Sequence, residues 1–150
     1  MAESDRTNLG IDASPQRLGR RHAADAERTY ACVVATGRLL ADLHCEDIVA
    51  FDLRGLSDVT DFILIASGTS DRQILAVARD VEDLAGQYNL QRFGREVDAP
   101  TTWLIADFVD LVVHLFEPNT RSHYDLEMMW GDAPKVDWQR GTAGGEGDDR

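Results

Sequence analysis

The chain has 150 residues, a length that fits one domain. Its 27 acidic residues outnumber its 15 basic ones, so the net charge is −12 with the histidines neutral. Such a chain repels phosphate backbones, which argues against direct nucleic-acid binding, and no stretch approaches the ~18 apolar residues of a membrane span. A basic protein partner would be attracted to it, although acidity that serves only solubility explains the composition equally well.

Both ends of the chain have the composition of disordered tails. Residues 1–24 are polar with scattered proline and glycine, and residues 139–150 contain no apolar stripe. The folded domain is therefore predicted to span residues 25–138, which is long enough to bury a core. Cys32 and Cys45 are predicted to be reduced thiols, because neither lies in a CxxC motif and no signal peptide is visible. The expected location is the cytoplasm.

Residues 26–44 form the first predicted helix, because apolar side chains recur on one face at helical spacing. Gly37 lies on that face and weakens the helix unless another side chain packs closely against it. Residues 47–53 follow as a strand. Residues 61–67 are almost continuously apolar, as expected for a central strand that is buried on both faces.

The clearest helix is predicted over residues 70–88, where apolar residues repeat at i, i+3, i+4 and i+7. Three elements follow it: a short strand at 90–93, an antiparallel hairpin of strands 101–108 and 110–117 that turns at Val109, and a helix at 119–130. Adjacent strands favour antiparallel pairing, whereas the helix between the second and third strands permits a crossover. The expected fold is α/β in composition and α+β in layout, a mixed β-sheet flanked by helices.

The stretch SGTSDRQ, residues 67–73, lies where the second strand gives way to this helix. A phosphate loop would need more glycines and usually a lysine, and this stretch has one glycine and no lysine. Ser70 and Gln73 instead have the spacing of a capping box, which satisfies backbone N–H groups in the first turn of the helix. We therefore predict a helix cap at Ser70 and Gln73, with anion binding near Arg72 as the alternative.

Catalytic and metal-binding groupings are missing from the sequence pattern. Nucleotidyltransferases pair a Gly-Ser turn with two carboxylates one residue apart, and Asp80 and Glu82 have that spacing. However, these two lie in the predicted helix, where side chains at i and i+2 point about 200° apart and cannot hold one ion. The four histidines and two cysteines form no metal signature. No catalytic residue, metal ion or cofactor is predicted.

Aromatic and methionine side chains gather near the end of the predicted domain. Trp103 begins a strand of the hairpin, and RSHYDLEMMW places Tyr124 and Trp130 on the last helix. Such residues form either core packing or the anchor points of protein interfaces. Strand alternation puts Trp103 and Asp107 on the same face, and a carboxylate is rarely buried without a partner, so this face is expected to be partly open.

Two segments resemble the Iojap family, also called ribosomal silencing factors. They are FDLRGLSDVTDFILIASGTSDRQ at 51–73 and WLIADFVDLVVHLFEPNTRSHYDLEMMWGDAP at 103–134. The resemblance implies a nucleotidyltransferase-like fold that lacks the catalytic groups. It further implies a binding factor that docks on protein number fourteen of the large ribosomal subunit, blocks subunit joining and represses translation in starvation. The partner-binding residues that it implies are Trp103, Leu104, Arg121, Tyr124 and Trp130.

Other functions are also compatible with the sequence. An organellar branch of the resembled family serves ribosome assembly, and an enzyme of nucleotide transfer or an interaction module with another partner would use the same fold. An exposed aromatic face also makes a homodimer plausible. The sequence departs from the family at Val109, where glycine is usual in the hairpin turn, and at Glu96–Val97, where Glu-Gly is common. Because β-branched residues resist a positive φ, the turn type is expected to differ.

Overall fold

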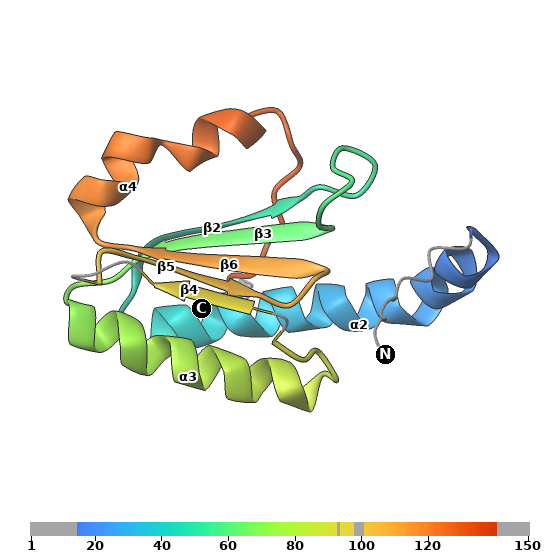
Figure 1. Cartoon of the computed structure of the whole chain (residues 1–150), viewed down its shortest axis with the longest axis horizontal. Coiled ribbons are helices and arrows are strands. Elements are labelled where there is room, and N and C mark those ends of the chain that lie inside the picture. The colour runs from blue at the N-terminus through green and yellow to red at the C-terminus, as the bar shows by residue number, and fades with distance from the viewer. Residues whose placement is uncertain (1–14, 93, 98–100, 141–150) are drawn as a thin grey trace, which may run out of the picture.

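The computed structural model describes residues 15–92, 94–97 and 101–140, and for residues 15–24 it describes the backbone alone. These residues form one five-stranded sheet with the strand order β2-β3-β6-β5-β4 (Figure 1). The elements in chain order are α2 (Pro15–Asp42), β2 (Glu46–Asp52), β3 (Phe62–Ser67), α3 (Asp71–Gln87), β4 (Gly94–Val97), β5 (Trp103–Asp107), β6 (Leu111–Phe116), α4 (Pro118–Tyr124) and the 3₁₀ helix η1 (Leu126–Trp130). Among the described helices, none has the length and apolar content that crossing a membrane requires.

The sheet is mixed, as predicted. β2 pairs with β3, β4 with β5, and β5 with β6 in antiparallel fashion, whereas the central strands β3 and β6 run parallel. A parallel pair needs a long crossover, and α3 lies within the segment that connects these two strands. The α+β fold with a helix-flanked mixed sheet is therefore confirmed.

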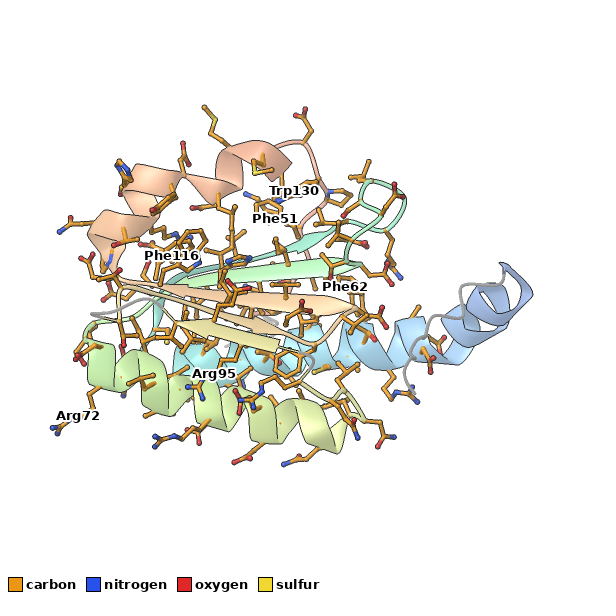
Figure 2. The ribbon with its side chains drawn as sticks, in the orientation of Figure 1. Phe51, Phe62, Arg72, Arg95, Phe116 and Trp130 are labelled. Carbon is orange, nitrogen blue, oxygen red and sulfur yellow. The ribbon has the colours of Figure 1, made fainter. Side chains whose placement is uncertain are left out.

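The two faces of the sheet are covered to different extents. α2 and α3 lie together across one face, and α4 and η1 lie over the other (Figure 1). The larger apolar core lies under α2 and α3, and includes Phe62, Leu64, Leu104 and Leu115. A smaller cluster lies under α4 and η1, where Phe51, Phe116 and Trp130 meet (Figure 2). Every residue of β3 is buried, which confirms the predicted central strand.

The first helix is longer than predicted. α2 begins at Pro15 rather than at residue 26, so the backbone of residues 15–24 is helical instead of part of a tail. Proline suits the first turn of a helix, because its missing N–H has no intrahelical partner there. Residues 1–14 of the predicted tail lie outside the described residues.

At the other end, the fold continues past residue 138. The Arg140 guanidinium forms two hydrogen bonds with the Asp42 carboxylate, at 2.8 and 2.9 Å. The indole of Trp138 packs against α2 at Gly37, where an added Cβ would lie 2.6 Å from the ring. This contact explains the glycine within α2. Residues 141–150 of the predicted C-terminal tail lie outside the described residues.

Two predicted elements differ from the observed ones. The short edge strand lies at 94–97 rather than 90–93, because Arg95 and its neighbours pair with β5. The predicted helix over 119–130 is broken at Asp125, which has a left-handed φ of 46° and separates α4 from η1. Cys32 and Cys45 are buried free thiols, as predicted.

The β5–β6 turn has positive φ despite the β-branched residue at its centre. Val109 has a φ of 74°, the Asp110 N–H donates to the Phe108 carbonyl at 2.9 Å, and the Asp107 carboxylate accepts from the Val109 N–H at 2.8 Å. This is the rarer, strained form of γ-turn. A β-branched residue resists positive φ, yet Val109 adopts it in this turn, so the valine is strained.

Candidate protein-binding surface

The half-covered face of the sheet carries the most distinctive surface of the described residues. Strand alternation in β5 places Trp103, Ile105 and Asp107 on this face, and all three are half-buried. Their neighbours Leu104 and Ala106 point into the core under α3. The predicted partial opening of the Trp103 face is thus confirmed.

Trp103 lies in an aromatic cluster built from three elements. Its ring stacks on Phe116 of β6 with a centroid distance of 4.8 Å, and Tyr124 of α4 covers it at 4.6 Å. The register of the hairpin places Trp103 directly opposite Phe116. The Trp103 Nε1–H donates to His114 Nδ1 at 3.1 Å. Aromatic contacts of this kind exceed simple area burial by roughly 0.5–1.5 kcal/mol a pair, so the cluster holds the indole firmly.

Beside this cluster, α4 and η1 expose a ridge of large apolar side chains. Tyr124 is 54% exposed, Met128 77% and Met129 68%. We call Trp103, Tyr124, Met128 and Met129 the aromatic–methionine surface. A soluble monomer rarely leaves such side chains together in water, and methionine adapts well to the shape of a partner.

Local sequence explains why the ridge takes this form. Glu117 caps α4, because its carboxylate accepts hydrogen bonds from the N–H groups of Asn119 and Thr120. These hydrogen bonds lower the pKa of Glu117. After about two turns, Asp125 adopts the left-handed conformation and the chain continues into the 3₁₀ helix η1. Asparagine and aspartate tolerate this conformation better than most residues.

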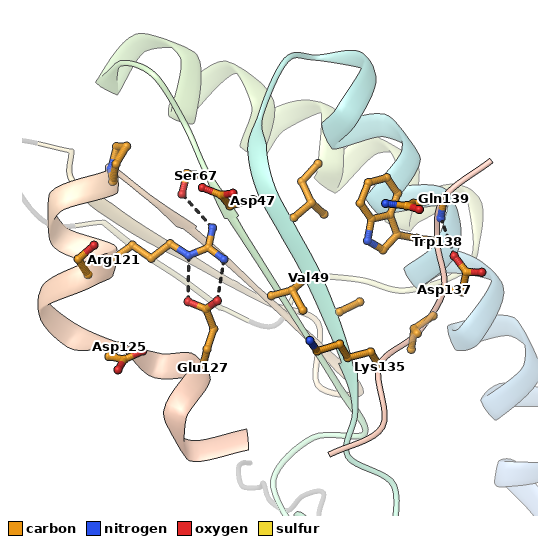
Figure 3. Close-up of a pocket in the computed structure, with 15 residues that line it drawn as sticks. Asp47, Val49, Ser67, Arg121, Asp125, Glu127, Lys135, Asp137, Trp138 and Gln139 are labelled. Atoms are coloured by element: carbon orange, nitrogen blue, oxygen red, sulfur yellow. Dashed lines mark hydrogen bonds and ion pairs between the residues drawn. The ribbon is translucent and has the colours of Figure 1, made fainter. Parts of the chain in front are cut away.

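Arg121 connects the two short helices to the sheet (Figure 3). Its guanidinium forms two 3.0 Å hydrogen bonds with the Glu127 carboxylate and a third, at 2.8 Å, with the Ser67 hydroxyl. The residue is only 8% exposed. The pair spans the break at Asp125, so it fixes the angle at which Tyr124 and the methionines are presented.

This ion pair lines a cleft of about 690 Å³ between α4, β2 and the segment after η1. Its lining includes Asp47, Asp125 and Asp137, together with Lys135, the one lysine of the chain (Figure 3). In the portion of the chain that the structure describes, no three histidine, cysteine or carboxylate groups are placed to share a metal ion.

Two of the predicted partner-binding residues have buried side chains. Leu104 is completely buried in the core under α3, because it alternates with Trp103 along the strand. Arg121 is buried too, and its guanidinium is occupied by Glu127 and Ser67. Neither side chain offers a surface to a partner. Trp130 packs on the smaller core and is half-buried, so Trp103 and Tyr124 are the two predicted residues that the structure brings together at the surface.

Ser70 occupies the N-cap of α3, and its hydroxyl accepts from the Gln73 N–H at 3.1 Å. The Gln73 side chain does not return to Ser70 as a full capping box would. It accepts from the N–H and hydroxyl of Thr69, and its amide donates to the Leu43 carbonyl at 3.0 Å. These bonds occupy the Ser70 hydroxyl, the Gln73 side chain and the Thr69 N–H.

Asp80 and Glu82 lie on α3, as the helical pattern predicts. Glu82 accepts a hydrogen bond from Arg92 at 3.0 Å and lies 3.8 Å from Arg95. Asp80 is exposed on another side of the helix. The carboxylates therefore diverge and do not form a two-carboxylate metal site.

Sequence reasoning missed the hydrogen bond between His114 and Trp103. The signal was present, because the turn at Val109 sets the hairpin register, and this register makes 103 and 114 diagonal neighbours on one face. The sequence pattern did not reveal that Met128 and Met129 would both be exposed, since a continuous helix would have turned one of them toward the sheet.

The exposed aromatic and methionine side chains of this α+β domain are of the types enriched in protein-binding surfaces. The chain belongs to the family described as "Ribosomal silencing factor during starvation", whose model matches residues 26–149. This match confirms the resemblance that the two sequence segments indicate.

Individual relatives agree with this assignment. The chain is 43% identical over 96 residues to the ribosomal silencing factor RsfS of Bacillus subtilis, an alignment that covers 64% of this chain and 81% of the relative. It is 32% identical over 116 residues to the chloroplastic protein Iojap of Arabidopsis thaliana, covering 75% of this chain and 47% of that protein. A crystal structure of a Chromobacterium violaceum protein matches with a TM-score of 0.61 at 28% identity, covering 69% and 84% of the two chains.

Proposed function

We propose that this protein is a ribosomal silencing factor that binds the large ribosomal subunit through its protein number fourteen. In this role it prevents the small subunit from joining and so represses translation when nutrients are limiting. The observation that carries the proposal is the aromatic–methionine surface, which lies on the face of the sheet that the helices leave half-covered. The family to which the chain belongs, described as a ribosomal silencing factor, supports a ribosomal partner.

The chemistry of the surface fits a protein partner. Tyr124, Met128 and Met129 provide apolar area, while Trp103 beneath Tyr124 adds a rigid aromatic anchor. Side chains of these types dominate the binding energy of protein interfaces. The net charge of −12 would attract a basic ribosomal protein and speed its encounter with this surface.

The proposed mechanism requires no chemical reaction. A bound domain occupies space that the small subunit needs, so repression follows from binding and steric exclusion alone. The competing hypothesis of a nucleotidyltransferase would need two carboxylates on one ion, and Asp80 and Glu82 diverge on α3. We therefore propose a binding factor rather than an enzyme.

Sedimentation with purified subunits tests the proposal. The protein is expected to migrate with the large subunit and not with the small one, and to reduce the formation of whole ribosomes when both are present. Tyr124→Ala and Met129→Ala should each weaken this binding by about 2 kcal/mol, which is roughly 30-fold. Met129 is exposed, so Met129→Ala should keep the wild-type melting temperature, whereas Tyr124→Ala should lower it slightly because the Tyr124 ring packs on Trp103.

Val59→Ala provides the control, because Val59 is an even more exposed apolar residue in the loop between β2 and β3. It should bind as the wild type does. Binding to neither subunit at low salt would refute the proposal, and equal losses in all three variants would refute the assignment of the surface.

A second role, in ribosome assembly, is favoured by one relative. The chain is 32% identical over 101 residues to a mouse protein named "Mitochondrial assembly of ribosomal large subunit protein 1", covering 61% of this chain and 42% of that protein. Depletion separates the two roles. Loss of an assembly factor should accumulate incomplete large subunits during growth, whereas loss of a silencing factor should leave more joined ribosomes in starved cells.

A further inference from the structure

One buried polar side chain on the half-covered face has no part in the binding surface itself. His114 lies in the middle of β6, is 7% exposed, and has Ile105 of β5 and Ile65 of β3 as its direct neighbours in register. Its diagonal neighbours on the same face are Trp103 and Asp107 of β5 and Ile63 and Ser67 of β3. A polar group in such surroundings costs stability unless it makes a hydrogen bond, so its partner defines what it does there.

That partner is the indole of Trp103, whose Nε1–H donates to His114 Nδ1 at 3.1 Å. Indole N–H can only donate, so Nδ1 must carry a lone pair and the imidazole proton must sit on Nε2. The two residues are diagonal neighbours across the β5–β6 pair. The hydrogen bond is thus a consequence of hairpin register, and it requires a neutral imidazole.

Stacking alone does not determine the orientation of the Trp103 ring. Phe116 and Tyr124 contact its faces at centroid distances of 4.8 and 4.6 Å. A flip of the indole would exchange its two edges and leave its faces stacked on Phe116 and Tyr124. These contacts therefore do not determine which edge of the ring faces β6. The bond to His114 distinguishes the edges: it directs the N–H edge toward β6 and turns the opposite edge away from His114.

We propose that His114 is a positioning residue for the aromatic–methionine surface, which holds the Trp103 indole in the single orientation that the protein partner recognises. His114 itself is too deeply buried to touch that partner. Burial lowers the pKa of His114 to about 4, which keeps the imidazole neutral and able to accept at physiological pH. The inference rests on the proposed function, because it assigns a role in that same binding site.

Two substitutions separate positioning from simple core packing. His114→Leu keeps a similar volume but removes the acceptor, whereas His114→Asn places an amide oxygen close to the position of Nδ1. His114→Leu should weaken binding to the purified large subunit by up to roughly 10-fold, the range of one hydrogen bond. His114→Asn should recover most of that loss. Val81→Ala, in the core on the opposite face, controls for destabilisation without contact to Trp103.

The orientation itself can be observed in the free protein by the indole ¹H–¹⁵N resonances. The chain has three tryptophans, and Trp103→Phe identifies the signal of Trp103. In the wild type and in His114→Asn this signal should lie downfield, as for a bonded N–H, and it should move upfield in His114→Leu. The same signal in Val81→Ala should stay at its wild-type position.

Three results would overturn the inference. One is full-strength binding by His114→Leu. Another is equal weakening in His114→Leu, His114→Asn and Val81→Ala, in proportion to lost stability, which would make His114 a packing residue. The third is an unchanged Trp103 resonance in His114→Leu. If the wild type binds no large subunit, the proposed function fails, and the resonances still decide whether His114 orients the indole.

Discussion

Val109 shows how a single residue can store strain in this fold. Its φ of 74° belongs to the left-handed region, which costs an L-residue about 1–2 kcal/mol and a β-branched one at least as much. The side chain is exposed, so its apolar contacts contribute little stability to offset this strain. The hydrogen bonds of Asp107 and Phe108 across the turn hold the conformation in place.

Replacing Val109 by glycine should therefore stabilise the protein. Glycine adopts positive φ without steric cost, and the gain is reduced by the greater freedom of glycine in the unfolded chain, leaving about 1 kcal/mol. Equilibrium unfolding in urea measures the difference. Val59→Gly, at an exposed position without positive φ, is the control and should destabilise or leave stability unchanged. A destabilised Val109→Gly would show that the turn is not strained.

His114 should make stability depend on pH. Its pKa is about 4 in the folded protein and about 6.5 when unfolded, so the unfolded chain binds more protons between these values. The contribution of His114 is complete above pH 6.5 and is lost as the pH falls toward 4, by about 3 kcal/mol in total. Unfolding free energies of the wild type and His114→Asn, measured from pH 7 to 4, should converge by that amount. Parallel curves would contradict the prediction, since carboxylates common to both proteins cancel.

At the scale of elements, the contact between α2 and the C-terminal segment organises one edge of the domain. The Pro134 carbonyl accepts from the Asp52 N–H and the Val136 N–H donates to the Ala50 carbonyl, both at 2.8 Å. The segment then places Trp138 on Gly37, and Arg38 donates to the Trp138 carbonyl at 2.9 Å. This contact between segments 100 positions apart thus depends on the absence of a side chain at Gly37.

Gly37→Ala tests this close approach. The new Cβ would lie 2.6 Å from Trp138, so the indole must move, and we expect a loss of about 1–3 kcal/mol despite the better helix propensity of alanine. Gly86→Ala in α3 is the matched control, because no atom lies within 4 Å of the position of its Cβ. It should stabilise by up to about 1 kcal/mol. Thermal unfolding of both variants measures the contrast, and stabilisation by both would mean that Trp138 does not pack there.

For the whole molecule, charge is the property that acts at a distance. The net charge of −12 creates a field that reaches beyond any contact and attracts basic surfaces. Salt screens this field over a Debye length of about 10 Å at 0.1 M. The aromatic–methionine surface, in contrast, acts only after contact, through apolar burial that salt does not weaken.

Association with the large subunit should therefore slow as salt rises from about 50 to 300 mM, while dissociation changes little. Stopped-flow or surface-based kinetics separates the two rates. Met129→Ala should show the opposite pattern: faster dissociation with the salt dependence of association retained. An association rate that is independent of salt would remove the electrostatic part of the proposed function.

Much of the fold was predictable because it depends on local pattern. The i, i+3, i+4 spacing of α3 and the apolar run of β3 each report burial along one element. Alternation in β5 was enough to place Trp103 on the half-covered face. The position of β4 was not predictable to within four residues, because a short edge strand is set by its pairing partner rather than by its own composition.

The sequence by itself determined the element types, the mixed sheet, the divergence of Asp80 and Glu82, and the family. Only the tertiary structure decided which side chains form the surface. Arginine is usually a surface residue, but Arg121 is buried. The Glu127 carboxylate balances its charge across the break at Asp125, and the Ser67 hydroxyl accepts a further hydrogen bond. His114 acquires its role from Trp103, a residue of another strand. Burial and hydrogen bonding depend on contacts between distant segments, and a one-dimensional pattern does not contain them.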